Sequence, residues 1–150
     1  MVIKKEEMGE WLAVMKKFQL IEHTADIGLI AYGQNLAEAF ANAAYGLFSI
    51  IANPEKVQEK ESRQIELSEA DPEALLFEWL NSLIYLFDVE MLLLKRFEIS
   101  NFDNCKLKAT VYGERYDPSR HQLKTGVKSA TYHMLNVDGE KKRVQVIFDV

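Results

Sequence analysis

Two segments of the chain carry apolar residues at the three-and-four spacing of an amphipathic helix. The first covers residues 36–51, with Asn35 and Glu38 at capping-box spacing and Asn53-Pro54 predicting its end. The second starts at Asp71-Pro72, an N-cap followed by proline at the first helical position, and ends near residue 90. The predicted buried faces are Leu36, Ala39, Phe40, Ala43, Ala44, Leu47, Phe48 and Ile51 in the first helix, and Leu75, Leu76, Trp79, Leu80, Leu83 and Phe87 in the second.

The rest of the chain favours β-strands. Short apolar or alternating segments predict strands near residues 18–23, 27–32, 62–67, 92–99, 107–111, 127–137 and 144–148. Asp138-Gly139 predicts a hairpin with a type I′ turn between the last two. Two helices with about six or seven strands predict an α+β domain, a two-layer sandwich with both helices on a mostly antiparallel or mixed sheet. The polar loop at residues 113–126 is long enough to suggest a functional role.

Length and composition are those of one globular domain. The chain has 150 residues, 48% of them apolar, and we expect residues 18–150 to form the domain and residues 1–17 a loosely attached N-terminal extension. No apolar segment has the length of a membrane span, and Cys105 is the only cysteine, which together favour a cytoplasmic protein. The net charge of −5 argues against direct, non-specific binding to nucleic acid.

The candidate chemistry centres on two aspartates far apart in sequence. Asp26 follows His23 in a polar cluster between two strand-like segments, and Asp149 ends the last strand. If their strands are neighbours, the carboxylates repel each other unless a cation lies between them, and oxygen ligands suit calcium or magnesium better than zinc. Taken alone, Asp26 is better explained as a turn cap, and His23 as its hydrogen-bond partner.

Other polar residues carry weaker signals. Lys128 stands at the start of a predicted strand, where a solvated charge is the ordinary interpretation. Glu114, Asp117 and His121 belong to the long polar loop and are expected at the surface. The sequence contains no nucleophile motif, phosphate-binding loop or paired-cysteine zinc motif, so no catalytic set is predicted.

Several ordered segments together resemble the archease family, and the resemblance runs from about Phe18 to the end of the chain. They are Glu22-His23-Thr24-Ala25-Asp26-Ile27-Gly28, Glu38-Ala39-Phe40, Asn42-Ala43-Ala44, Gly46-Leu47-Phe48, Trp79 to Asp88, Gly113-Glu114-Arg115-Tyr116-Asp117-Pro118 with His121, Val127-Lys128, Thr131-Tyr132-His133 and Asp149-Val150.

The resemblance implies an accessory protein of the RtcB-type RNA ligase that acts in tRNA splicing and RNA repair. Such a protein promotes guanylylation and multiple turnover of the ligase, broadens its nucleotide use and has no catalysis of its own. The resemblance also implies a divalent cation, usually calcium, bound by Asp26, Asp149 and an oxygen of Val150. His23, the candidate hydrogen-bond partner of Asp26, is then expected to support this site. Lys128 matches a lysine needed for activation. The partner is the ligase, and tRNA is reached only through it.

Two other classes of function stay open. In a metal-dependent hydrolase, Asp26, Asp149 and His23 would bind the metal and Asp117 or Glu114 would act as the base. In a chaperone-like module for RNA-modifying enzymes, the acidic surface and the long loop would only bind partners.

Overall fold

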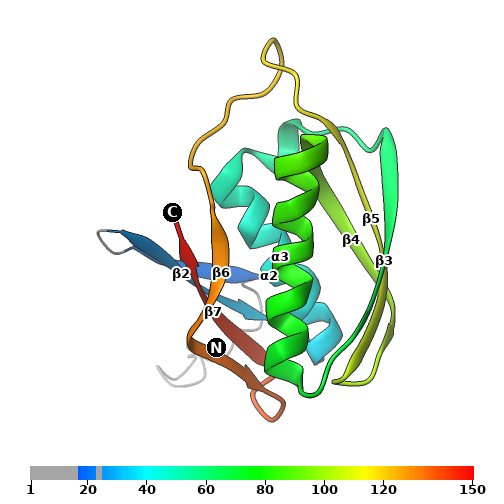
Figure 1. Ribbon diagram of the computed structural model, residues 1–150, viewed down its shortest axis with the longest axis vertical. Helices are drawn as coiled ribbons and strands as arrows, with labels where there is room; N and C mark the ends of the chain where they lie inside the picture. The colour runs from blue at the N-terminus through cyan, green and yellow to red at the C-terminus, as the bar shows by residue number, and fades with distance from the viewer. Residues whose placement is uncertain (1–16, 23–24) are drawn as a thin grey trace, which may run out of the picture.

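The computed structural model describes residues 17–22 and 25–150. The elements follow in the order β1 (Phe18–Glu22), β2 (Asp26–Tyr32), α2 (Leu36–Ile51), the 3₁₀ helix η1 (Pro54–Lys56), β3 (Glu61–Ser68), α3 (Pro72–Glu90), β4 (Leu92–Phe102), β5 (Lys106–Arg115), β6 (Ser129–Asp138) and β7 (Arg143–Asp149) (Figure 1). Within these residues, no helix is both long and apolar enough to cross a membrane.

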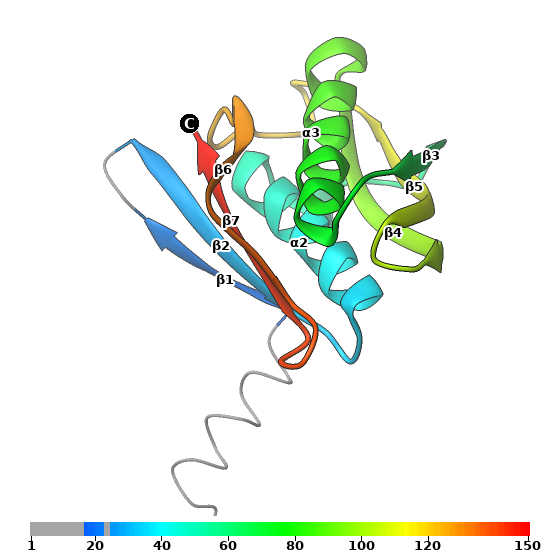
Figure 2. The ribbon, with the colours of Figure 1, turned by 60° about the horizontal axis from the view of Figure 1, so that its bottom comes forward.

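The strands form two antiparallel sheets, one in the order β1-β2-β7-β6 and the other in the order β3-β5-β4. Both helices lie between the sheets (Figure 2), and each contacts strands of both. The predicted α+β class is confirmed, and the part of the chain that the structure describes contains two α-helices and seven strands. The pattern of apolar residues in the sequence did not reveal that the strands divide into two sheets. Because they do, the helices form a middle layer.

The predicted helix starts are confirmed by their caps. The Asn35 side chain accepts a hydrogen bond from the backbone N–H of Glu38 at 2.8 Å, and the Glu38 side chain accepts one from Gln34 at 3.2 Å. In α3, the Asp71 side chain accepts one from the N–H of Ala74 at 2.8 Å. These bonds satisfy N–H groups that a helix start leaves without partners.

The hairpin between β6 and β7 is confirmed, but the predicted type I′ turn is wrong. Gly139 does not have a positive φ, and the left-handed residue is Lys142, with φ of 52°. The Asp138 side chain accepts hydrogen bonds from the N–H groups of Glu140 and Lys141, at 3.1 and 3.0 Å. Such bonds favour a longer loop built on a type I turn.

The core is continuous across the middle layer. Trp79 of α3 is fully buried, and its Nε1 donates a hydrogen bond to the carbonyl oxygen of Phe40 in α2 at 2.9 Å. A Cβ atom on Gly46 would lie 2.5 Å from Leu29 Cδ1, so this glycine lets α2 pack closely on β2. The tight packing fixes β2, the strand that begins with Asp26.

Candidate functional site

Asp26 and Asp149 are direct partners in the pairing of β2 with β7. Residues directly opposite each other in an antiparallel pair point to the same face, with Cβ atoms about 4.5–5.5 Å apart. The two strands are therefore neighbours, as a shared site requires, and the two carboxylates stand side by side at one end of the sheet. We call this pair the acidic corner.

Asp26 is half-buried, and its Oδ1 is buried without a hydrogen-bond partner in the described part of the chain. Asp149 is exposed. A buried acceptor without a partner destabilises a fold by about 1–3 kcal/mol, and like charges directly opposite on a sheet add to that. A bound cation would relieve both effects, and carboxylate oxygens are ligands that calcium and magnesium prefer.

Lys128 and Val150 lie next to the acidic corner. The backbone N–H of Lys128 donates a hydrogen bond to the carbonyl oxygen of Asp149 at 2.8 Å, and Ser129 is the strand partner of Asp149. The Lys128 side chain is exposed. The Val150 side chain is half-buried and packs against the core. The backbone at Lys128 is thus fixed directly to the end of β7.

The described residues supply only part of a metal site. His23 and Thr24 lie outside them, so the structure places neither. Over residues 17–22 and 25–150, no group of three or more His, Cys, Asp or Glu side chains has the arrangement of a metal site. The acidic corner therefore contributes two carboxylates from these residues.

A buried ionic cluster lies at the end of β5. Glu114 is 4% exposed and His121 is 6% exposed, so the expectation that both lie at the surface is wrong. The Glu114 carboxylate accepts hydrogen bonds from the Gln58 N–H at 2.6 Å, from His121 Nε2 at 3.1 Å and from Arg120. His121 Nδ1 accepts one from the Asp117 N–H at 2.9 Å, which puts the imidazole proton on Nε2.

The pKa values of the two acids in this region are both lowered. Burial acts to raise the pKa of Glu114, but the hydrogen bonds from Gln58, Arg120 and His121 outweigh it and hold the pKa below its usual value. Hydrogen bonds from the hydroxyl and N–H of Ser119 lower the pKa of Asp117. Glu114 belongs to the other sheet and is fully engaged, so the geometry gives no support to its use as a hydrolytic base beside Asp26.

The loop that follows the buried ionic cluster is also held at its far end. The N–H of Lys124 donates to the carbonyl of Ile51 at 2.8 Å, and the N–H of Thr125 donates to Ile50 at 3.3 Å. The Lys124 ammonium donates to the carbonyl of Ser49 at 2.7 Å. These bonds satisfy carbonyls at the C-terminal end of α2, where a positive charge is favoured. The loop therefore reaches Lys128 on a fixed path.

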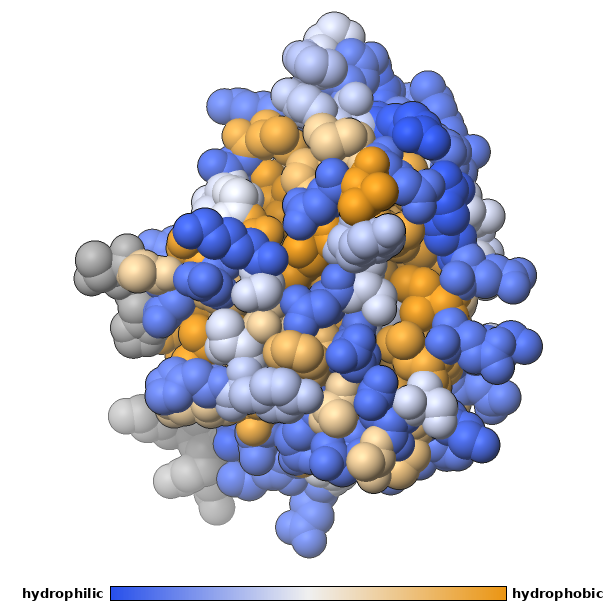
Figure 3. All heavy atoms as spheres, in the orientation of Figure 1, coloured by the Kyte–Doolittle hydropathy of each residue, from blue (hydrophilic) through white to orange (hydrophobic). Residues whose placement is uncertain are grey.

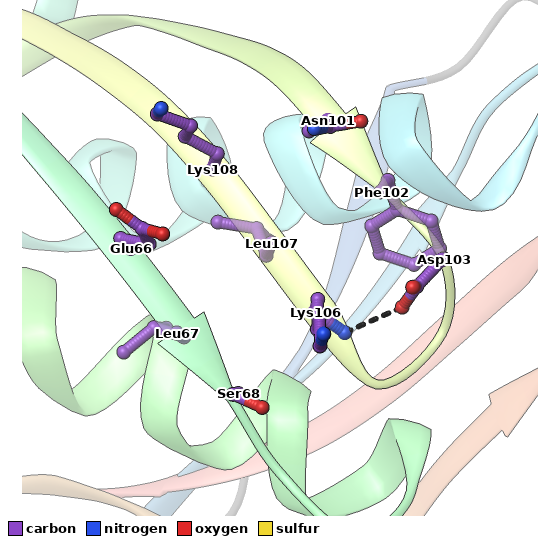
Figure 4. A pocket seen from close by; sticks show the side chains of 9 residues that line it. All are labelled: Glu66, Leu67, Ser68, Asn101, Phe102, Asp103, Lys106, Leu107 and Lys108. Atoms are coloured by element: carbon purple, nitrogen blue, oxygen red, sulfur yellow. Dashed lines mark hydrogen bonds between the residues drawn. The ribbon is translucent and has the colours of Figure 1, made fainter.

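A separate hollow of about 440 Å³ lies where β4 turns into β5 (Figure 4). Asp103 Oδ1 accepts hydrogen bonds from the N–H groups of Cys105 and Lys106, at 3.0 and 2.7 Å, and so stabilises the turn. Phe102 and Leu107 also line the hollow. It lies on the β3-β5-β4 sheet, whereas the acidic corner lies on the other sheet. It is explained by the turn and contributes nothing to the candidate site.

The fold and the site define a class of small α+β protein with two helices between two antiparallel sheets and paired carboxylates at one sheet end. A model of the archease protein family matches residues 18–150. The chain belongs to the archease family. The resemblance inferred from the sequence is confirmed, and the residues before the match lie within the predicted extension.

Individual relatives agree with this assignment. An archease from Sulfurisphaera tokodaii is 41% identical over 128 residues, covering 84% of this chain and 91% of the relative. An archease from Pyrococcus abyssi is 42% identical over 127 residues, covering 83% and 89%.

Solved structures show the same fold. The solution structure of protein 1598 from Methanobacterium thermoautotrophicum has a TM-score of 0.75 and 32% identity, and the match covers 89% of this chain and 99% of that one. The crystal structure of a Thermotoga maritima archease, described as a possible chaperone, has a TM-score of 0.60. It is 23% identical, covers 88% of this chain and 96% of that one, and supports the fold alone.

Proposed function

We propose that this protein is a metal-binding protein cofactor that activates an RtcB-type RNA ligase in tRNA splicing and RNA repair. It promotes guanylylation and multiple turnover of the ligase and broadens its nucleotide use, without a catalytic set of its own. Its direct partner is the ligase, in the cytoplasm, and tRNA is reached only through that partner. Membership of the archease family supports this function, and the acidic corner is the observation that carries it.

Asp26 and Asp149 are the residues that would hold a divalent ion, with calcium as the expected ion. The fit rests on Asp26 Oδ1, which is buried without a hydrogen-bond partner among residues 17–22 and 25–150, and on the carboxylate opposite it. In this proposal, Val150 adds an oxygen and His23 orients a ligand by a hydrogen bond. When bound, the ion supplies positive charge beside the phosphates of the ligase's nucleotide.

Lys128 is the residue that this protein would present to the ligase. Its ammonium is exposed, while its backbone is bonded to Asp149. A fixed backbone limits the positions that a flexible lysine side chain reaches, which favours action at one place. In the proposal, Lys128 lies near the triphosphate of the ligase's nucleotide and offsets negative charge that develops as pyrophosphate leaves.

A single-turnover guanylylation assay of the ligase tests the proposal. The wild type should accelerate the reaction, and Asp149→Asn and Lys128→Ala should each lose most of that acceleration. Lys128→Ala should still bind calcium, which separates the lysine from the metal site. Lys141→Ala, which removes a lysine from the exposed hairpin loop, is the matched control and should behave as wild type.

The other outcomes identify the competing classes. Full acceleration by Asp149→Asn would refute a role for the metal site and favour a chaperone-like module. Hydrolysis of a phosphoester by the wild type alone, lost in Asp149→Asn, would identify a hydrolase instead.

A further inference from the structure

A row of side chains at four-residue spacing forms the outer crest of α3. It consists of Phe77, Asn81, Tyr85 and Val89, which succeed one another along the same side of the helix. Tyr85 is 61% exposed and Val89 is 59% exposed. Figure 3 shows the face on which α3 lies in front, where apolar surface appears between hydrophilic side chains. An aromatic and an aliphatic side chain thus face solvent on adjacent turns of a helix whose other side is core.

One flank of this crest is continuous with the strand that leads to the acidic corner. Tyr132 of β6 is 60% exposed and stacks on Phe77, with ring centroids 4.1 Å apart and planes 18° from parallel. The Asn81 side chain accepts a hydrogen bond from the N–H of Ala130 at 2.9 Å. Ala130 lies two residues after Lys128, so the crest and the proposed activating lysine meet on one connected surface.

The other flank is a groove of about 610 Å³ between α3 and β3. Ile65 and Leu86 are apolar residues in its lining, and Glu66, Glu78 and Glu90 are its acids. Among the described residues that line the groove, Arg63 is the one cation, and its guanidinium is already bonded to Glu90 at 2.7 and 3.1 Å. Apolar lining with surplus negative charge matches an apolar side chain flanked by lysine or arginine.

The negative charge of α3 itself also favours a basic partner. The helix carries four acids, Glu73, Glu78, Asp88 and Glu90, and no lysine or arginine. Against a second copy of this chain, the same acids would face each other in a two-fold contact and repel. RNA phosphates would be repelled as well. A protein with a basic, partly apolar surface is therefore the occupant that the electrostatics favour, and an enzyme that binds RNA must have cationic surface.

We propose that Tyr132, Phe77, Tyr85, Val89 and the adjoining groove form the surface on which the RNA ligase docks through a basic, apolar segment. This inference rests on the proposed function and deepens it, because it separates docking on α3 from the action of Lys128 and the acidic corner. Truncation of an exposed aromatic anchor at an interface commonly weakens binding by about 10- to 30-fold. Reversal of a charge at the rim changes the salt dependence of binding as well.

The test is the dissociation constant between the full chain and its ligase, measured at low and moderate salt. Tyr85→Ala should weaken binding at least about tenfold, and Asp88→Lys should weaken it most at low salt. The matched controls are Leu20→Ala on β1, another exposed apolar residue, and Glu140→Lys in the hairpin loop, another exposed acid. Both controls should bind within about twofold of wild type.

Two further readouts separate docking from activation. Each α3 variant should keep the calcium affinity of the wild type, and excess Tyr85→Ala should restore guanylylation, because only docking is impaired. If the wild type binds and activates the ligase while Tyr85→Ala and Asp88→Lys bind equally well, the docking surface is refuted and the proposed function stands. If the wild type neither binds nor activates the ligase, both are refuted. If the variants lose affinity for a tRNA fragment but not for the ligase, the surface binds RNA and the docking proposal is wrong.

Discussion

Asp26 is a residue that locally destabilises the fold. Its Oδ1 is buried without a partner among the described residues, and its strand neighbour is another acid. A fold selected for stability alone would not keep two carboxylates opposite each other, because each raises the energy of the other. Such exceptions are expected where a ligand supplies what the chain lacks.

Asp26→Asn should therefore stabilise the metal-free protein. The amide removes one negative charge and can donate a hydrogen bond to Asp149, a gain of about 1 kcal/mol that raises the melting temperature by a few degrees. Thermal unfolding in EDTA measures this effect. Calcium should then raise the melting temperature of the wild type and leave that of the variant unchanged. A lower melting temperature of the variant in EDTA would show that the Asp26 charge is already compensated.

Glu114→Gln should destabilise the protein by about 1–3 kcal/mol at neutral pH, because it weakens the charged hydrogen bonds that a buried carboxylate accepts. The pKa of Glu114 is lower in the folded protein than in the unfolded chain. The ionised Glu114 thus contributes its full stabilisation at pH values above the pKa of the unfolded chain, about 4.3. This stabilisation is lost as the pH falls through the pKa of the folded protein. Urea unfolding of both proteins between neutral and acidic pH should show the difference shrinking towards the acidic end. A difference that stays constant would exclude Glu114 ionisation as its source.

Individual residues were predictable from sequence to different degrees. Asp26 and Asp149 were named because carboxylates at strand ends imply a shared site once the strands pair. Glu114 and His121 were missed because a polar loop gives no sign of burial, and burial here depends on Gln58, which reaches Glu114 from the segment before β3, together with Arg120 of the loop itself. The alternation of Leu107, Ala109 and Val111 predicts the strand but places position 114 on its opposite face, so it gave no sign that Glu114 is buried.

At the scale of elements, local sequence signals were sufficient to predict where the helices begin, but not to predict the type of the turn between β6 and β7. The caps at Asn35 and Asp71 depend on residues three positions away, so the sequence contains both partners of each bond. The turn after Asp138 depends on a choice between loop lengths of similar energy, and the left-handed residue at Lys142 is not distinguished by its residue type.

Lys142→Gly should stabilise the hairpin by about 0.5–1 kcal/mol, because glycine adopts a positive φ without the clash that a Cβ atom introduces. The Lys142 side chain is exposed, so little packing is lost. Its carbonyl, which accepts a hydrogen bond from the Gly33 N–H at 3.1 Å, is unchanged. Chemical denaturation measures the gain, and Lys141→Gly, in the same loop without a positive φ, is the control that should not stabilise. Equal effects at both positions would contradict the conformational explanation.

At the scale of the whole molecule, the helices connect two sheets that share no strand pairing. Sequence periodicity predicts which face of a strand is buried but not which strand lies beside it, so the division into two sheets needed the structure. Since each helix packs on both sheets, neither sheet buries its inner face without the helices.

The whole domain should consequently unfold as one cooperative unit. In a Trp11→Phe variant, Trp79 is the only tryptophan, and it reports on the middle layer. Its fluorescence and the far-UV circular dichroism should change at the same urea concentration. Separated midpoints would show that one sheet unfolds before the other.

The way α3 lies against β6 also bears on how this protein avoids aggregation. An outer strand with free N–H and C=O groups is a template on which another chain can add a strand. Here, the Asn81 side chain accepts from the N–H of Ala130, and the Glu73 side chain accepts from that of Val137 at 3.3 Å. Addition of a foreign strand at β6 would require α3 to leave its place and expose the core. Among the described strands of this sheet, growth into a fibril would therefore have to start at β1, the opposite border.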